Sequence, residues 1–138
     1  MEVYDRILST TLSSHPLTHY RLKMISTRAQ CTEDHISRIG LGLSIRKGSV
    51  EADWVPSQLE SEEGKYVGMN DKVLKGTTLF KDELPLWIAL ILRNNQPANY
   101  REWRKVIISH WERGVEELAL IDSASDDWVR SLKSCLPN

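Results

Sequence analysis

The hydrophobic pattern is strongest between Asp82 and Ile121, and it begins with a segment, Leu84 to Leu92, that is apolar without a break. A helix that is hydrophobic on all sides has to be covered on all sides. The segment is much shorter than the roughly 20 residues that a helix needs to span a bilayer. We therefore expect a helix that lies at the centre of a core, and we expect that core to be shared with another chain.

The residues around this segment carry helix start and stop signals. Asp82 can act as the N-cap, because its carboxylate can accept hydrogen bonds from the free backbone N–H groups of the first turn. Pro85 fits only in the first turn, where its missing N–H costs little. The run from Arg93 to Asn95, shortly before Pro97, should end the helix.

A second helix is predicted from about Ala98 to Ile121, because large residues recur along it every three or four positions and form one stripe. These residues are Tyr100, Trp103, Val106, Ile107, Trp111, Val115, Leu118 and Ile121. Gly114 interrupts the helix at a cost of roughly 1 kcal/mol relative to alanine. We interpret this glycine as the mark of close contact with a neighbouring helix.

Before residue 80 the pattern is mixed. Met1 to Leu12 has the spacing of one helix face, and the cluster from Ser13 to Pro16 ends that helix. Leu17 to Thr27 alternates apolar and basic residues, which favours a strand with one buried face; a continued helix is the alternative. Thr32 is expected to start a short helix that Gly40 caps.

The clearest β signal lies near residues 41–55. Apolar residues alternate there along two short runs, which predicts a β-hairpin that turns at Lys47 and Gly48. The runs are Leu41, Leu43 and Ile45, then Val50, Ala52 and Trp54. Residues 56–64 are polar and acidic, as expected of a surface loop. Further elements are expected as strands at Lys65–Met69 and at Lys72–Leu74 or Thr77–Phe80, and as a last helix at Ser125–Leu136.

These elements together predict an α+β fold. The composition changes near residue 80, from mixed and β-like to helical. We therefore place a boundary there, between a mixed α/β part, residues 1–80, which holds the β-hairpin, and a helical part, residues 81–138.

The composition is that of an ordinary globular chain, and it argues against several classes of protein. The 138 residues are 41% hydrophobic and 27% charged, with a net charge of −1, which gives no bulk positive charge for binding nucleic acid. Cys31 and Cys135 cannot make a disulfide framework, and no signal peptide or membrane segment is visible. We therefore expect a reduced, intracellular protein of the nucleus or cytoplasm. Five tryptophans against one phenylalanine favour protein interfaces as well as core.

The sequence carries no motif for catalysis: it has no Gly-rich phosphate loop, nucleophile elbow, paired-cysteine motif or metalloprotease helix. We therefore predict a protein that is not an enzyme and holds no cofactor. The side chains with the chemistry of a zinc site are those of His15, His19, Cys31 and His35. Pro16 lies inside the first pair, and such spacings arise easily by chance, so surface histidines and a buried thiol are the favoured interpretation.

A basic side on the second long helix opens an alternative. Arg101, Arg104, Lys105 and Arg113 cluster there, as a nucleic-acid surface requires. Glutamates alternate with them on the same helix, and alternating charge usually marks a solvated face. A small regulatory module that binds nucleic acid or zinc is therefore the alternative to a protein-interaction subunit.

Residues 75–92, KGTTLFKDELPLWIALIL, resemble the domain junction of subunits of the GINS complex, the four-protein assembly of the eukaryotic and archaeal replicative helicase. The matching residues are Lys75, Gly76, Thr77 and Leu79, then Leu84, Pro85, Leu86, Trp87, Ala89 and Leu92. Tyr100–Arg104, Val115–Leu118 and, faintly, Met1–Leu8 are similar to the third Psf-type subunit. The sequence departs from the family in the longer junction at Lys81–Glu83, in the longer segment before it, and in a shorter helical part.

The resemblance implies a non-catalytic scaffold subunit of a hetero-oligomer that acts in DNA replication in the nucleus. Its helical part would pack beside sister protein subunits, with nucleic acid contacted indirectly at most and no membrane involved. We expect the partner surface among the large apolar residues of the helical part. These are Leu84, Leu86, Trp87, Leu90, Trp103, Trp111 and Trp128.

Overall fold

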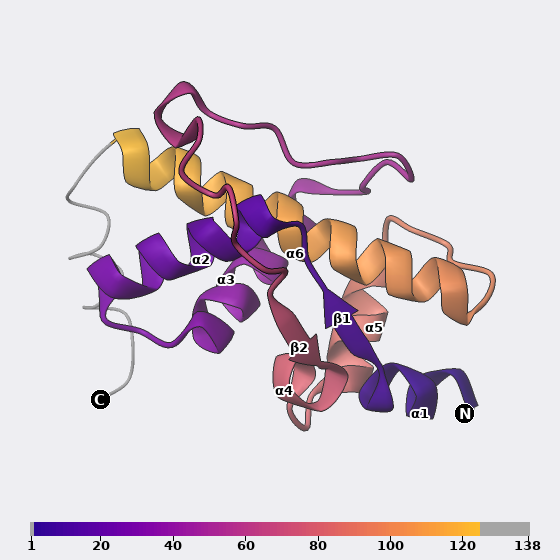
Figure 1. The fold of residues 1–138 in the computed structure, drawn as a ribbon. Coiled ribbons are helices and arrows are strands. Elements are labelled where there is room, and N and C mark those ends of the chain that lie inside the picture. Colours follow the sequence, from indigo (N-terminus) through magenta and orange to yellow (C-terminus); the bar gives the residue numbers. More distant parts are fainter. Residues whose placement is uncertain (1, 125–138) are drawn as a thin grey trace.

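The longest helix, α6, runs along most of the molecule, and the helices α2 and α3 pack against it (Figure 1). The computed structural model describes residues 2–124, with side chains from 3 to 123. In chain order the elements are α1 (Glu2–Ser9), β1 (Thr11–Ser13), α2 (Pro16–Ala29), α3 (Glu33–Lys47), the 3₁₀ turn η1 (Glu60–Glu62), β2 (Val73–Lys75), α4 (Gly76–Phe80), α5 (Leu84–Leu92) and α6 (Tyr100–Ala124). The predicted helix Ser125–Leu136, with Trp128, lies outside the described residues.

One hydrophobic core joins residues from both sides of position 80. Ile7, Leu22 and Phe80 belong to the same buried cluster as Ile107 and Trp111 of α6. The change in composition near residue 80 therefore does not separate two cores. The α+β class is confirmed, because a small antiparallel sheet accompanies the helices.

The sheet pairs β1 with β2 and places Leu12 opposite Leu74, with both side chains buried. The strand predicted at Lys72–Leu74 is thus confirmed in β2, although the N-terminal helix ends earlier than predicted to leave room for β1. Strand predictions elsewhere are wrong. Residues 77–80 belong to the helix α4, and residues 65–68 lie in turns because Gly64 and Gly68 take positive φ angles of 76° and 84°.

α2 occupies the segment for which a strand was favoured, so the helix alternative is correct. Its buried residues have helical spacing: they are Leu17, Thr18, Arg21, Leu22, Ile25 and Ala29. The alternation of apolar and basic residues was misleading because Arg21, a cation expected to face solvent, is only 1% exposed. His15 forms the N-cap of α2, and Pro16 occupies its first turn.

The β-hairpin predicted near residues 41–55 is wrong. Thr32 caps a helix as expected, but this helix, α3, continues through Gly40 and ends only at Gly48, whose φ is 112°. Its buried face consists of Ile36, Ser37, Gly40, Leu41, Ser44 and Ile45. Half of these residues are small or polar, so a search for large apolar residues sees the alternation of Leu41, Leu43 and Ile45 and misses the helical face.

The small residues of α3 face α6, where the two backbones come very close. A Cβ atom placed on Gly114 would lie 1.7 Å from the carbonyl oxygen of Gly40, which no side chain can tolerate. The contact with a neighbouring helix predicted from Gly114 is confirmed. Ser37 and Ser44 lie on the same buried face of α3, which therefore meets α6 with small side chains.

The two helices predicted after residue 80 are confirmed as α5 and α6. The N-cap of α5 is Glu83 rather than the predicted Asp82, and it makes no side-chain cap hydrogen bond. Lys81 has a positive φ of 53° and turns the chain immediately after α4. Asp82 then lies one residue before the N-cap position of α5. None of the helices between residues 2 and 124 combines the length and apolar character that a membrane-spanning helix requires.

Candidate functional site

Within the part of the chain that the structure describes, the apolar helix α5 packs against the core with one side and faces solvent with the other. Leu84, Ile88 and Ile91 are at most 4% exposed and belong to the core. On the opposite side Leu86 is 56% exposed, and Ala89 also faces solvent. The helix holds no polar residue between Leu84 and Leu92, so the side that faces water is as apolar as the side that packs.

The expected partner-binding residues divide into two groups. Leu84, Trp103 and Trp111 are buried within the chain, which makes them core residues with no surface to offer to a partner. Leu86 is exposed, and Trp87 and Leu90 are half-buried. Trp128 lies outside the described residues.

The side of α5 that faces solvent, together with the C-cap residue Arg93, forms a continuous stripe in which Leu90 is half-buried and the other members are exposed. Leu86, Ala89, Leu90 and Arg93 follow one another at helical spacings of three and four, which places them along one face. We call these four residues the outer stripe. It is apolar for its first three members and ends in a cation.

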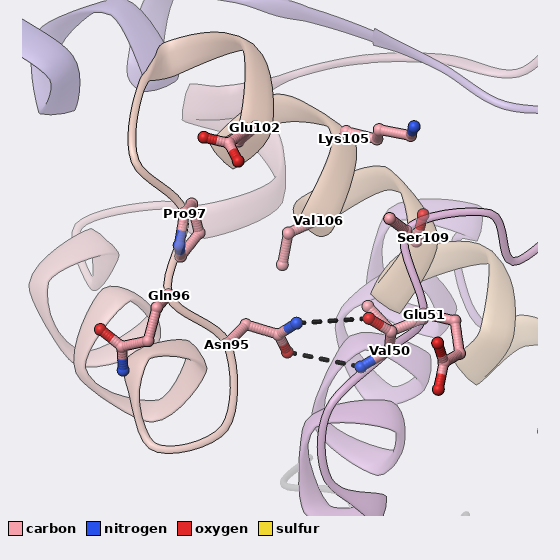
Figure 2. Close-up of a pocket in the computed structure, with 10 residues that line it drawn as sticks. Val50, Glu51, Asn95, Gln96, Pro97, Glu102, Lys105, Val106 and Ser109 are labelled. Carbon is pink, nitrogen blue, oxygen red and sulfur yellow. Dashed lines mark hydrogen bonds between the residues drawn. The ribbon is translucent and has the colours of Figure 1, made fainter.

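A second candidate site is a cleft of about 190 Å³ between the α5–α6 loop, the segment after α3 and the first half of α6 (Figure 2). Its lining includes Val50, Glu51, Asn95, Gln96, Glu102, Lys105 and Ser109. The amide of Asn95 lies against the backbone of Val50, with Nδ2 donating to the Val50 carbonyl at 3.3 Å and Oδ1 accepting from its N–H at 3.4 Å. Both ends of this amide are therefore engaged within the protein.

Asn95 also makes a hydrogen bond with His110, which is 1% exposed. The atom of Asn95 that accepts from the N–H of Val50 is its amide oxygen, Oδ1. An amide oxygen can only accept, so Nε2 of His110, 3.1 Å away, donates to it. Nδ1 then accepts from the hydroxyl of Ser44 at 2.8 Å, and this hydroxyl accepts from Nε of Arg113 at 2.8 Å. With the ring neutral, its single proton is on Nε2.

Burial and the positive charge of Arg113 both favour this neutral ring, and they lower the pKa of His110 from 6.5 to about 4. A serine, a histidine and an asparagine in one hydrogen-bonded chain have the chemistry of a hydrolytic triad. Here, however, Ser44 is 0% exposed and His110 is 1% exposed, so no substrate can reach the hydroxyl. The chain of hydrogen bonds instead ties α3 and the α5–α6 loop to α6.

Arg113 completes the same contact. Its guanidinium donates to the carbonyls of Ser44, Gly48 and Ser49 at 2.6–2.8 Å, which satisfies free carbonyl groups at the C-terminal end of α3. Arg104 donates to the carbonyl of Thr11 at 2.9 Å. Two of the four cations predicted to form a basic side on α6 therefore serve contacts within the chain, which leaves Arg101 and Lys105 exposed.

The His/Cys set is not brought together. His15 accepts a hydrogen bond from the N–H of Leu17, the ring of His19 contacts the carbonyl of Asn70, and Cys31 donates to the carbonyl of Ala29. Among residues 2–124, no three or more histidine, cysteine or acidic side chains converge as metal ligands. Each polar atom named here has its own partner in the protein.

Sequence reasoning missed a buried charge cluster. Arg21 of α2 makes a two-pronged contact with Glu62 at 2.8 Å and reaches Glu116 of α6 at 3.0 Å. Burial alone lowers the pKa of Arg21, but the two carboxylates more than offset it and the net shift is upward. Glu62 lies in the segment expected to be a surface loop, yet it is 5% exposed. No local signal marks this contact, because the partners lie far apart in the sequence.

Geometry alone defines these sites. No protein-family model matches the chain, and neither the curated proteins nor the solved structures compared with it gave a match. Of the candidates, the polar network around His110 is buried within the chain, whereas most of the outer stripe of α5 faces solvent.

Proposed function

We propose that this protein is a non-catalytic scaffold subunit of a hetero-oligomeric assembly, and that the outer stripe of α5 is its docking surface. The observation that carries the proposal is the exposure of Leu86 on a helix with no polar residue. A single exposed leucine is normal on a protein surface. A helix that is apolar on the side facing water is different, because an ordinary surface helix carries polar residues there.

The resemblance to GINS subunits supports a finer proposal, in which the partners are sister GINS-type subunits. The resembling residues fall on the end of β2, on α4 and on α5, and they include Leu86 and Ala89 of the outer stripe. The exposed helix and the resembling segment therefore coincide. The buried environment of Ser44 and His110 favours a non-catalytic role for the same protein.

Photo-crosslinking in cells of the source organism tests the proposal. Leu86 is replaced by p-benzoylphenylalanine in the full chain, and crosslinked proteins are identified by mass spectrometry. We expect a defined protein partner, and for the finer proposal a GINS-type subunit. The matched control places the same amino acid at Val67, which is 79% exposed and lies in a turn outside α5. Position 67 should not capture that partner.

Size-exclusion chromatography of the purified chain gives an independent measurement. Without a partner the chain is expected to self-associate or aggregate through its exposed apolar surface. Leu86→Glu should then elute at the volume of a monomer. A wild-type chain that is a soluble monomer and crosslinks no protein through position 86 would contradict the proposal.

A further inference from the structure

A groove of about 630 Å³ lies between the C-terminal ends of α3 and α5, directly beside the outer stripe. Its walls include Gly42, Ile45, Arg46 and Lys47 from α3, and Leu90 and Arg93 from α5. Leu90 and Arg93 also belong to the outer stripe, so the apolar surface of α5 continues into the groove. No acidic residue lines it, among the residues that the structure describes.

Two of the cations at this groove are available for a ligand. Lys47 is paired with Glu117 at 2.9 Å. Arg46 and Arg93 are exposed, and the side chain of neither makes a hydrogen bond or ion pair with any of the residues that the structure describes. The groove therefore presents two unpaired guanidinium groups, and guanidinium is the cation best suited to binding carboxylates through two hydrogen bonds.

A structural role for these arginines is the competing explanation, because cations in the last turn of a helix favourably face its negative end. At α3 another residue fills this role. Arg113 already donates to the carbonyls of Ser44, Gly48 and Ser49, so the end of α3 does not need Arg46. Arg46 is left facing solvent at the groove.

We propose that the groove binds an acidic amphipathic helix of the partner subunit. This inference rests on the scaffold function proposed above. Its carboxylates would meet Arg46 and Arg93, and its apolar residues would cover Leu86 and Leu90. A helix in a groove between two helices is a common mode of peptide recognition. The apolar part of the surface favours a protein over nucleic acid, whose phosphates would use the arginines but leave the leucines in water.

A second crosslinking position tests this inference separately from the function. Asn94 lines the groove and is exposed, and its side chain makes no hydrogen bond with the described residues. p-Benzoylphenylalanine at position 94 should capture the same protein as position 86, within a segment that carries Asp or Glu beside apolar residues. A synthetic peptide of that segment, labelled with fluorescein, then measures binding to the full chain by anisotropy.

Charge changes identify the contact. Arg46→Gln/Arg93→Gln should weaken peptide binding about fivefold to tenfold, as expected for the loss of two partly exposed ion pairs. Added salt should weaken the wild-type complex more than that of the double variant. The matched control, Arg101→Gln/Lys105→Gln, neutralises two exposed cations of α6 that do not line this groove, and should leave the affinity unchanged.

The outcomes separate the two proposals. A partner captured at position 86 but not at 94 overturns the groove inference and leaves the scaffold function standing, whereas no partner at either position overturns both. Capture at 94 of nucleic acid, of a second copy of this chain, or of a segment without acidic residues overturns the inference. So does a peptide that binds the Arg46→Gln/Arg93→Gln variant as tightly as the wild type.

Discussion

The contact between α3 and α6 and the outer side of α5 are built in opposite ways. Between α3 and α6 the backbones nearly touch at Gly40 and Gly114, and the polar side chains of Ser44 and His110 are hydrogen-bonded to one another. The outer side of α5 is apolar, and Leu86 is more than half exposed. The first region is covered within the chain, whereas the apolar side chains of Leu86 and Ala89 in the second face water.

This difference shows that hydrophobicity alone does not locate the core. The face of α3 that packs against α6 is rich in small and polar residues. The most hydrophobic helix of the described chain, α5, lies partly outside the core. Close packing decides which positions are buried, and small residues allow it where two backbones meet. Substitutions in the two regions should therefore differ in how much they lower the free energy of unfolding. The loss should be large for buried residues that contact α6 and small for residues of the outer stripe.

The largest effect is expected at Arg21, which joins α2 to α6 through buried charge. Arg21→Met leaves the carboxylate of Glu62 buried without its cation, and this should lower the free energy of unfolding by about 3–5 kcal/mol in urea denaturation. Arg28→Met on the same helix breaks the more exposed ion pair with Asp122, and should cost less than about 1 kcal/mol.

A double variant tests the reason for this loss. Arg21→Met/Glu62→Gln removes the more deeply buried of the two charges that Arg21 pairs with, so it should be more stable than Arg21→Met alone. Equal stability of the two variants would show that buried charge is not the cause.

The next effect is expected where α3 and α6 touch. Gly114→Ala places a methyl group 1.7 Å from the carbonyl oxygen of Gly40, so the helices have to move apart. Overpacking of this kind costs about 1–3 kcal/mol or more, and it should outweigh the gain of about 1 kcal/mol in helix propensity. Gly42→Ala is the matched control, because its nearest new contact is an ordinary 3.8 Å. It should leave the thermal midpoint unchanged or raise it.

A pH-dependent effect is expected from His110. The folded protein holds this ring neutral down to about pH 4, whereas in the unfolded chain its pKa is near 6.5. The unfolded state therefore binds more protons between these pH values, and stability falls as the pH decreases through this window, by up to about 3 kcal/mol. Above pH 6.5 the contribution is fully present. Denaturant titrations at several pH values between 7 and 4 measure it.

The control for this titration is His110→Gln, which removes the ionisable ring. Burial raises the pKa of Glu112, and this acts in the opposite direction, because the folded state then favours the protonated carboxyl as the pH falls. Glu112 is present in both proteins, so the difference between their pH profiles isolates the ring. Identical profiles would show that the neutral state of His110 contributes nothing to stability.

The smallest effect on stability is expected on the outer stripe. Leu86→Ala removes a side chain that is already 56% exposed, and should cost less than about 1 kcal/mol. Ile88→Ala, on the inner side of the same helix, removes a side chain that is 3% exposed and should cost about 2–5 kcal/mol. Urea denaturation of the two variants compares the faces directly. An equal loss at both positions would mean that α5 has no free face.

Several parts of this fold could be predicted from the sequence because their signals are local. Thr32 lies where a helix cap is needed, and the stripe of α6 repeats over many turns, which leaves little ambiguity. Gly114 could be interpreted as a helix contact because glycine inside a long helix is costly without such a reason. Pro85 could be placed in the first turn of α5 because its ring excludes most other positions in a helix.

Other parts depended on contacts between residues distant in sequence. Local alternation favoured β structure at residues 41–47, but the segment is helical, and its small residues lie on the face that meets α6. Arg21 is buried only because Glu62 and Glu116 converge on it from two other segments. Of the residues predicted to bind a partner, Leu86 is exposed and Leu90 is half-buried, whereas Trp103 and Trp111 are core.

The sequence by itself determined that α5 is apolar on every side and that α6 is amphipathic, because these properties belong to the order of residues along one helix. Only the tertiary structure decided which side of α5 is covered, and that Arg46 and Arg93 meet at one groove beside it. The burial of a side chain depends on what other segments bring against it. That information lies in packing between distant segments, which no local pattern contains.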